Sequence, residues 1–208
     1  MKALFVTGTD TGVGKTFVAR ALVSAWRRAG RSVGVMKPSE TGCELRDGEL
    51  FPADAALLAR EAGSTQDLAE VCPSRFRKPM APAEAAALEG GGFSFERAME
   101  VFASIRDRHD VTLVEGAGGL LVPFAGSLTT VDLIARFDIP VLIVARVGLG
   151  TINHTGLTVA HARARGLNIA GVVFTRGLDP DTYPPGPDEA RNPDTIARLF
   201  DVPVLGNI

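Results

Sequence analysis

A glycine-rich segment near the amino end of the chain carries the residue types that bind a polyphosphate. Residues 8–16 read GTDTGVGKT; they follow the apolar run 3–6 and precede residues 17–23, which have helical spacing. In such a strand–turn–helix unit, backbone N–H groups and the helix N-terminus surround the phosphates, Lys15 reaches the β- and γ-phosphates, and the Thr16 hydroxyl ligates Mg²⁺. The segment therefore predicts a phosphate-binding loop, or P-loop.

One position departs from the strict P-loop pattern. That pattern has glycine where this chain has Thr9, and the glycine stands one residue earlier, at Gly8. The alternative is an ordinary glycine-containing turn between a strand and a helix. Because Gly14, Lys15 and Thr16 stand together at the start of the predicted helix, we favour the nucleotide site.

A second segment places a carboxylate at the end of a predicted strand. Residues 111–119 read VTLVEGAGG, in which four β-prone residues lead to an acidic residue and a glycine-rich turn. A glutamate at a strand end is usually only solvated, but beside a P-loop it can face Mg²⁺. We therefore predict that Glu115 ligates a metal and that the glycines of 116–119 let the backbone approach a ligand closely.

Lys37 and Asp54 are two further candidates. Lys37 follows the predicted strand 32–36, which Pro38 ends. Because open α/β sheets bind ligands at the carboxyl ends of their strands, we favour a functional Lys37 over a solvated charge. Asp54 precedes the predicted helix 55–60, so its simplest role is to cap that helix, and contact with Mg²⁺ or its water shell is the competing role.

Strands and helices alternate along the chain. Apolar runs predict strands at 3–6, 32–36, 111–114, 140–145, 167–174 and 202–205. Helical spacing predicts helices at 17–29, 55–60, 82–88, 95–106, 130–137, 154–164 and 190–200. Irregular segments are predicted at 39–42, 71–82, 148–153 and 180–187. This alternation predicts an α/β fold of the P-loop NTPase type, with one doubly wound, mostly parallel sheet, helices on both faces, and a single domain over residues 1–208.

Composition narrows the function classes. The 208 residues are 46% hydrophobic and 22% charged, which is typical of a globular protein with one substantial core. A net charge of −2 gives no electrostatic footprint for nucleic acid or an acidic membrane, so neither is predicted as a partner. The run 3–6 is too short for a signal peptide and no stretch reaches membrane-span length, so a cytoplasmic location is predicted. Cys43 and Cys72 fit neither a metal pattern nor a disulfide framework and are predicted to be reduced.

With these segments in hand, the chain resembles the dethiobiotin synthetase family. The matching motifs follow the family's order across nearly the whole chain: 8–16, Lys37-Pro38 with Thr41-Gly42, Asp54-Ala55, 114–119, 149–154 (LGTINH) and 203–206 (PVLG). The first motif alone is shared with cobyrinic and cobyric acid amide synthetases. The segment around Lys37 and the turn 152–154 are more specific to the dethiobiotin synthetases.

The resemblance implies an enzyme, a C–N-forming cyclo-ligase that joins 7,8-diaminononanoate and CO₂ to give dethiobiotin through a carbamate phosphorylated by ATP. Mg²⁺ is the implied cofactor and ATP the co-substrate. Lys37 and Lys15 are the implied catalytic residues, and Thr16, Asp54 and Glu115 are the implied Mg²⁺ ligands.

The resemblance also implies the binding positions. Those for ATP are Gly12, Val13, Gly14, Lys15, Thr16, Phe17, Asp54, Glu115, Gly116, Ala117, Gly118, Thr175, Arg176, Val204, Leu205 and Gly206. Those for the substrate are Thr11, Thr41, Gly150 and Asn153, of which the segment 150–153 reaches the substrate across a homodimer interface. The family often has Asn after the late strand to read adenine, whereas this chain has Thr175 and Arg176, so we expect other nucleoside triphosphates to serve as well.

Two alternatives compete with this interpretation. One is an ATPase of the cobyrinic or cobyric acid amide synthetase type; these take ammonia from a glutaminase domain, for which 208 residues leave no room. The other is a dimerising switch ATPase, a class that usually carries an additional lysine early in the P-loop, where this chain has Thr9 and Asp10. Dependence of ATP turnover on a diamine separates both from the synthetase.

Overall fold

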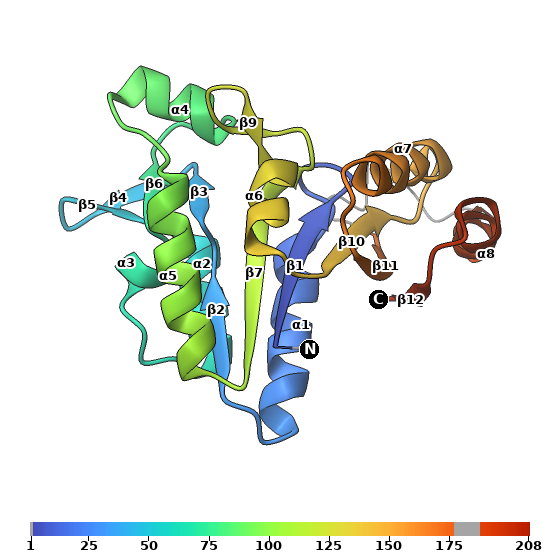
Figure 1. Ribbon diagram of the computed structural model, residues 1–208, viewed down its shortest axis with the longest axis horizontal. Helices are drawn as coiled ribbons and strands as arrows, with labels where there is room; N and C mark the ends of the chain where they lie inside the picture. The colour runs from blue at the N-terminus through green and yellow to red at the C-terminus, as the bar shows by residue number, and fades with distance from the viewer. Residues whose placement is uncertain (1, 177–187) are drawn as a thin grey trace.

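The computed structural model describes residues 2–176 and 188–208 and shows an α/β fold built on a six-stranded sheet (Figure 1). Neighbouring strands run parallel in the order β12-β11-β10-β1-β7-β2. The strands are β1 (Ala3–Gly8), β2 (Val33–Met36), β7 (Val111–Gly119), β10 (Val141–Arg146), β11 (Ile169–Thr175) and β12 (Val204–Asn207). Every residue of β1 and β2 is buried, as expected of apolar strands covered on both faces. The predicted doubly wound parallel sheet is confirmed.

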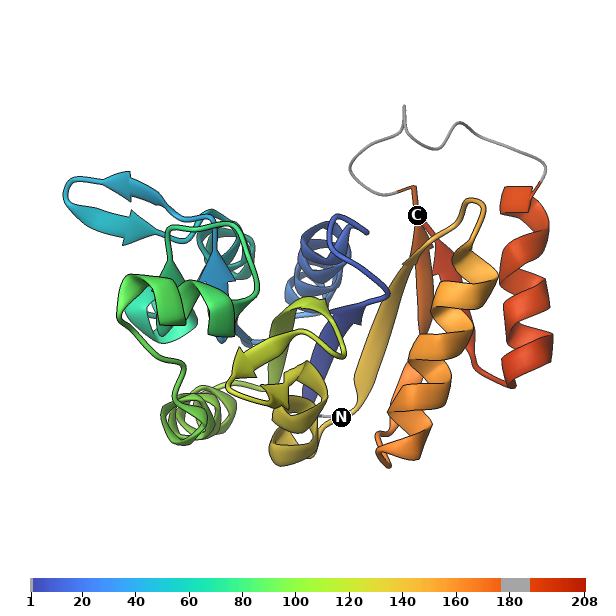
Figure 2. The ribbon, with the colours of Figure 1, turned by 90° about the horizontal axis from the view of Figure 1, so that it is seen from above.

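Helices cover both faces of the sheet, as Figure 2 shows. The covering helices are α1 (Lys15–Arg28), α2 (Ala53–Ala62), α5 (Phe95–Arg108), α6 (Thr130–Phe137), α7 (Thr151–Ala164) and α8 (Asp188–Phe200). Side chains of β1 alternate between the faces: Phe5 packs in a cluster with residues of α5 and α6, whereas Leu4 and Val6 pack with residues of α1 and α2. Residues of α7 and α8 pack with β10 and β11.

The strand order reverses at β1. From β1 the chain crosses to the edge strand β2, returns through β7 between them, and then builds β10, β11 and β12 on the other side. In open α/β sheets, ligands bind in the crevice at the carboxyl ends of the strands where the order reverses. The P-loop begins where β1 ends, so the fold places it at this crevice.

Several short elements were not predicted. The segment 71–82 was expected to be irregular, but it contains β6 (Ser74–Phe76), which pairs in parallel with β3 (Ser39–Thr41), in a segment predicted as a loop. Their polar residues do not alternate with apolar ones, so the strand period is absent from the sequence. The other unpredicted elements are β4 (Glu44–Arg46), β5 (Glu49–Phe51), α3 (Leu68–Val71), β8 (Pro123–Ala125) and β9 (Leu128–Thr129). Helix α4 (Pro82–Glu89) was predicted at 82–88. Strand β7 was predicted to end before Glu115, but it continues to Gly119, so the expected glycine-rich turn 116–119 is part of the strand. The predicted loop 180–187 lies outside the described residues.

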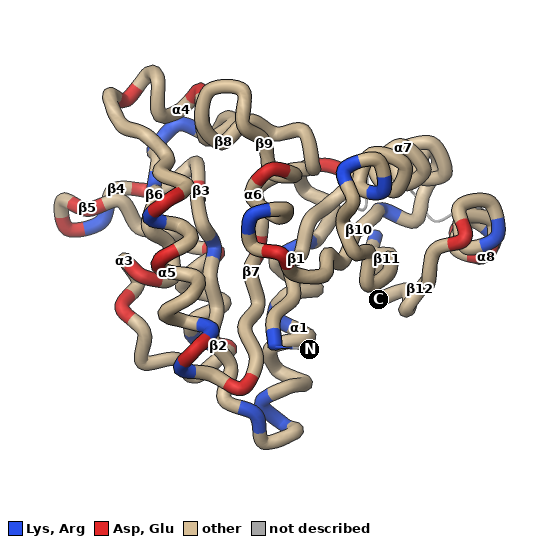
Figure 3. The backbone as a smooth tube through the Cα atoms, in the orientation of Figure 1, with Lys and Arg blue, Asp and Glu red and all other residues tan. Residues whose placement is uncertain are grey.

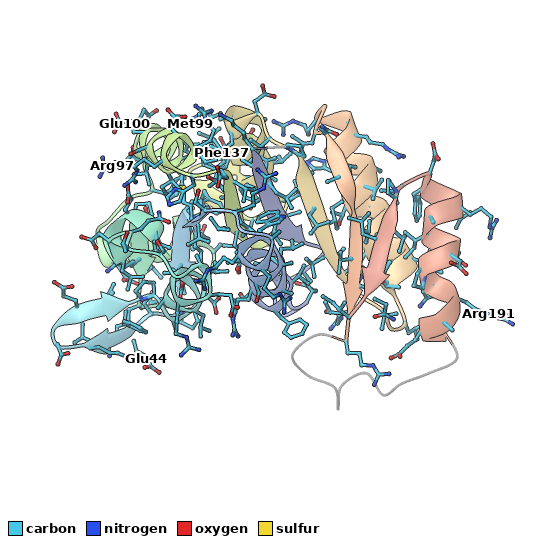
Figure 4. All side chains as sticks on the ribbon, turned by 90° about the horizontal axis from the view of Figure 1, so that it is seen from below. Glu44, Arg97, Met99, Glu100, Phe137 and Arg191 are labelled. Atoms are coloured by element: carbon cyan, nitrogen blue, oxygen red, sulfur yellow. The ribbon has the colours of Figure 1, made fainter. Side chains whose placement is uncertain are left out.

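Basic and acidic residues are interspersed along the described chain, as Figure 3 shows. On α5, Arg97 and Glu100 form an exposed ion pair with 3.6 Å between nitrogen and oxygen, while Phe137 of α6 is buried (Figure 4). Cys43 and Cys72 are buried free thiols. Within residues 2–176 and 188–208, no helix combines the length and apolar character that crossing a membrane requires.

Candidate active site

The segment 8–16 has the geometry of a P-loop. It leaves β1 at Gly8 and enters α1 at Lys15. Gly12 has a φ of 74° and Gly14 a φ of 90°, backbone angles that residues other than glycine rarely adopt. A Cβ at Gly14 would also lie 2.9 Å from the Thr175 hydroxyl. The conformation of this loop therefore depends on glycine. The N–H groups in the first turn of α1, which have no acceptor within the helix, face the loop.

The Lys15 side chain folds over this loop. Its Nζ donates a hydrogen bond to the carbonyl oxygen of Asp10 at 2.9 Å. Burial lowers the pKa of Lys15 to about 8, against the opposing influence of the Glu115 carboxylate. A buried ammonium with one carbonyl acceptor is suited to exchange that acceptor for phosphate oxygens.

Four chain segments bring a hydroxyl, a lysine and two carboxylates together beside the P-loop. Glu115 Oε1 accepts hydrogen bonds from Thr16 Oγ1 at 2.7 Å and from Lys37 Nζ at 2.8 Å. Lys37 Nζ also lies 3.2 Å from Asp54 Oδ2. The strand register explains the meeting of Lys37 and Glu115, because Met36 pairs with Val114. Lys37 follows Met36 and Glu115 follows Val114, so the two side chains come one position after a paired position.

Lys37 keeps its positive charge although it is buried. Burial alone would lower its pKa, but the carboxylates of Glu115 and Asp54 outweigh that effect and raise the pKa above its ordinary value. Lys37 therefore stays protonated at neutral pH, in contact with a carboxylate that is itself fully buried.

The donor set beside the P-loop fits a magnesium ion. Glu115 Oε2 is buried and, within residues 2–176 and 188–208, has no hydrogen-bond partner. A buried carboxylate oxygen is costly to leave unmatched, and a cation would satisfy it. The described residues hold no group of three or more His, Cys, Asp or Glu side chains arranged for a metal. Mg²⁺ in nucleotide sites needs only one or two carboxylates, because phosphates and water complete its shell.

These groups line one cavity of about 460 Å³. The predicted site residues in its wall are Thr11, Gly12, Gly14, Lys15, Thr16, Phe17, Lys37, Thr41, Asp54, Glu115, Gly116, Ala117 and Gly118. Val13 lies beneath the loop in the hydrophobic core. The wall also includes Arg20 and Leu57, which no motif marks, and Glu40, which belongs to the polar segment 39–42 that was predicted to carry substrate contacts.

Asp54 does not cap α2 as predicted. The helix begins at Ala53 after Pro52, so Asp54 already lies in its first turn and its carboxylate faces Lys37. Glu40 supplies the cap: its Oε1 and Oε2 accept hydrogen bonds from the backbone N–H groups of Asp54 and Ala55, both at 2.9 Å. The capping prediction assumed a local acceptor, and no sequence pattern reveals an acceptor 14 residues earlier.

Gly150 and Asn153 lie elsewhere. The segment 148–153 was predicted as a turn, but α7 begins at Thr151, so Asn153 is in its first turn. Both residues line a second cavity of about 730 Å³ with apolar neighbours that include Leu149 and Leu157. These leucines are 82% and 64% exposed. Within one chain, the structure does not bring Asn153 into the P-loop cavity.

Thr175 and Arg176, which replace the Asn that often reads adenine in the family, are engaged by other groups. Thr175 Oγ1 donates a hydrogen bond of 2.5 Å to the Val13 carbonyl oxygen, and Arg176 forms an ion pair with Glu189 at 3.2 Å. Val204, Leu205 and Gly206 lie on the edge strand β12. None of these five predicted positions lines the P-loop cavity as the described residues form it.

A P-loop between β1 and α1, with a lysine just after β2 and a carboxylate within the neighbouring strand β7, defines a P-loop nucleotide-binding protein of the α/β class. A family model described as an AAA domain matches residues 2–208. The chain belongs to the family of ATP-dependent dethiobiotin synthetases. It is 48% identical to the enzyme named ATP-dependent dethiobiotin synthetase BioD of Anaeromyxobacter sp. (strain K), over 96% of this chain and 86% of that one. Proteins of the same name from Bacillus licheniformis and Bacillus subtilis (strain 168) are 44% and 38% identical, over 99% of this chain and 85% and 86% of theirs.

Solved structures agree on the fold. The cell division ATPase MinD of Pyrococcus furiosus matches with a TM-score of 0.55 and 20% identity, over 100% of this chain and 83% of that one. The kinase domain of the Escherichia coli tyrosine kinase ETK matches with a TM-score of 0.53 and 18% identity, over 83% of this chain and 66% of that one. At these identities the likeness concerns the fold alone.

Proposed function

We propose that this chain, as a single catalytic domain, forms dethiobiotin from 7,8-diaminononanoate, CO₂ and ATP. One amine of the substrate adds CO₂ to give a carbamate. The carbamate oxygen attacks the γ-phosphorus, which releases ADP and leaves a carbamic–phosphoric anhydride. The second amine then attacks the carbonyl carbon, inorganic phosphate leaves, and the cyclic urea closes.

The contact between Lys37 and Glu115 inside the P-loop cavity is the observation that carries the proposal. Lys37 is buried and positively charged, so it can bridge the carbamate and the γ-phosphate. Lys15, also in the cavity wall, would neutralise charge on the transferring group. Because little covalent work falls to the protein in phosphoryl transfer, positioning and charge neutralisation are its main tasks.

Mg²⁺ is the cofactor that we assign to Thr16, Asp54 and Glu115. Bound there, it would supply charge neutralisation at the β- and γ-phosphates. The unmatched Oε2 of Glu115 and the oxygen-only donor set support this assignment. Thr11 and Thr41, both in the cavity wall, are the proposed substrate contacts within the same chain.

The substrate site is completed by a second copy of the chain. Gly150 and Asn153 belong to a surface with exposed leucines, and exposed apolar patches of this kind mark interfaces. We place these two residues at the partner's P-loop cavity in a homodimer. A cytoplasmic location agrees with the two buried free thiols.

A subunit-mixing experiment tests the shared site. Lys37→Ala and Asn153→Ala proteins, each inactive alone, are expected to regain up to about a quarter of wild-type activity when unfolded together and refolded, because random C₂ pairing yields heterodimers with one intact site. The recovered activity is read as dethiobiotin formed per total subunit. Mixtures without activity would place Asn153 outside the partner's site.

The site is expected to discriminate weakly among nucleoside triphosphates. A base is distinguished by a paired donor and acceptor, and the Thr175 hydroxyl is turned to the Val13 carbonyl. GTP and CTP should therefore support turnover with kcat/KM within about tenfold of the ATP value, the difference that one ordinary hydrogen bond makes. Competition kinetics measure this ratio, and a preference for ATP above about a thousandfold would contradict it.

Phosphate release from purified protein with MgATP and bicarbonate tests the proposed function, with the product followed by mass. Release that requires 7,8-diaminononanoate and matches the cyclic urea supports the synthetase. Release that ignores the diamine would instead favour an amide synthetase or a switch ATPase. The curated relatives named above do not favour either alternative, since all three carry the synthetase name.

A further inference from the structure

Glu40 is a buried carboxylate in the wall of the P-loop cavity, and the reaction described above gives it no role. It lies on β3, three residues after Lys37, and is 6% exposed. Both of its oxygens are used: one accepts the N–H of Asp54 and the other the N–H of Ala55, each at 2.9 Å. A buried carboxylate that accepts two backbone N–H groups is arranged to fix a main chain in place.

The main chain that Glu40 fixes is the first turn of α2. The N–H groups at the start of a helix have no acceptor within the helix, and a side chain at the preceding position commonly supplies one. Here that position is Pro52, whose side chain has no polar atom. Glu40, which lies on strand β3, supplies the acceptors instead. Its negative charge matches the positive end of the helix dipole.

This turn also carries Asp54. The backbone N–H of Asp54 is bound by Glu40, and its carboxylate lies 3.2 Å from Lys37 Nζ. The Asp54 side chain is 43% exposed, so its own packing does not hold it in position. The anchored backbone and the contact with Lys37 are what determine where this carboxylate points.

We propose that Glu40 is a positioning residue that acts through Asp54: it holds the first turn of α2 against β3 so that the Asp54 carboxylate stays beside Lys37 and the metal position. The inference rests on the proposed function for the metal role of Asp54. Glu40 itself touches neither substrate nor metal in this account.

Calorimetry of ADP binding with and without Mg²⁺ tests the proposal. In Glu40→Ala, the enhancement of ADP affinity by Mg²⁺ is expected to fall about tenfold, since coupled neighbours commonly interact at this scale, while metal-free ADP binding stays unchanged. Glu40→Gln should fall in between, because its amide has one oxygen to accept one N–H and an NH₂ group that cannot accept the other.

Two further variants separate positioning from general stability. Ser94→Ala removes the side-chain cap of α5, where Ser94 Oγ accepts the N–H of Arg97 at 3.1 Å, outside the cavity wall. It should lower the melting temperature as a lost cap does and leave the Mg²⁺ enhancement intact. In an Asp54→Ala background, adding Glu40→Ala should produce no further loss of the enhancement.

Glu40→Ala or Glu40→Gln proteins that melt earlier but keep the full Mg²⁺ enhancement would overturn the proposal, as would an equal loss in the Asp54→Ala background. A wild-type protein that makes no dethiobiotin would overturn the proposed function instead. The calorimetric comparison still stands in that case, because it needs only ADP and Mg²⁺.

Discussion

Lys37→Ala is expected to lower kcat about a hundredfold or more, since removing one preorganised cation from a transition state commonly costs about 3 kcal/mol. Lys37 is buried, protonated and held at 2.8 Å from Glu115 in the wall of the P-loop cavity. The positive charge of Lys37 would be best placed at the stage where the carbamate oxygen bonds to the γ-phosphorus. ATP affinity should change much less, because the P-loop and Lys15 remain. Steady-state kinetics of dethiobiotin formation measure the effect.

The structure adds a stability cost to this variant. Glu115 is fully buried and, among the described residues, keeps only the Thr16 hydroxyl as a hydrogen-bond donor when Lys37 is lost. We therefore expect cooperative unfolding at a lower temperature than for the wild type, because a buried charge has lost its partner. Lys78→Ala removes an exposed lysine that lies outside the cavity wall and serves as the control. Near-full turnover in Lys37→Ala would remove Lys37 from the mechanism.

Glu115→Gln is expected to have the second large effect. The variant keeps the size of the side chain but loses the charge that faces Lys37 and the unmatched oxygen assigned to Mg²⁺. We expect kcat to fall about a hundredfold, equivalent to about 3 kcal/mol, and the Mg²⁺ concentration for half-maximal rate to rise. A Mg²⁺ titration of the rate at saturating ATP measures both quantities.

The control for this variant is Glu100→Gln, which makes the same chemical change on α5 at a side chain that is 70% exposed. It should leave both the rate and the Mg²⁺ requirement unchanged. If Glu115→Gln lowers the rate without changing the Mg²⁺ requirement, Glu115 orients Lys37 but does not bind the metal.

The central part of the fold could be predicted because its signals are local. Apolar runs such as 3–6 and 140–145 bury on both faces of a parallel sheet, and α6 was predicted with its observed bounds. The site residues after β1, on β7 and after β2 follow from the same logic, because parallel strands present their carboxyl ends at one edge of the sheet. The motifs of these residues predict both the strand and the chemistry of the site.

The remainder depends on contacts between distant segments. The β3–β6 pair joins segments 35 positions apart, and neither segment has a periodic pattern that predicts the pairing. The cap of α2 comes from Glu40, so the sequence around Asp54 suggested the wrong role for that carboxylate. Asn153 lines a different cavity in a single chain, and its expected contact with the substrate of a partner subunit stays a prediction.

The central claim is that this site transfers a phosphoryl group from ATP to a carbamate oxygen. The most direct test supplies CO₂ labelled with ¹⁸O, together with MgATP and 7,8-diaminononanoate, and measures the label in the inorganic phosphate by mass spectrometry. Because the oxygen that attacks the γ-phosphorus leaves with phosphate when the ring closes, we predict one ¹⁸O in each phosphate released with a cyclic urea. Phosphate that forms in step with the urea but carries no oxygen from CO₂ would contradict the account.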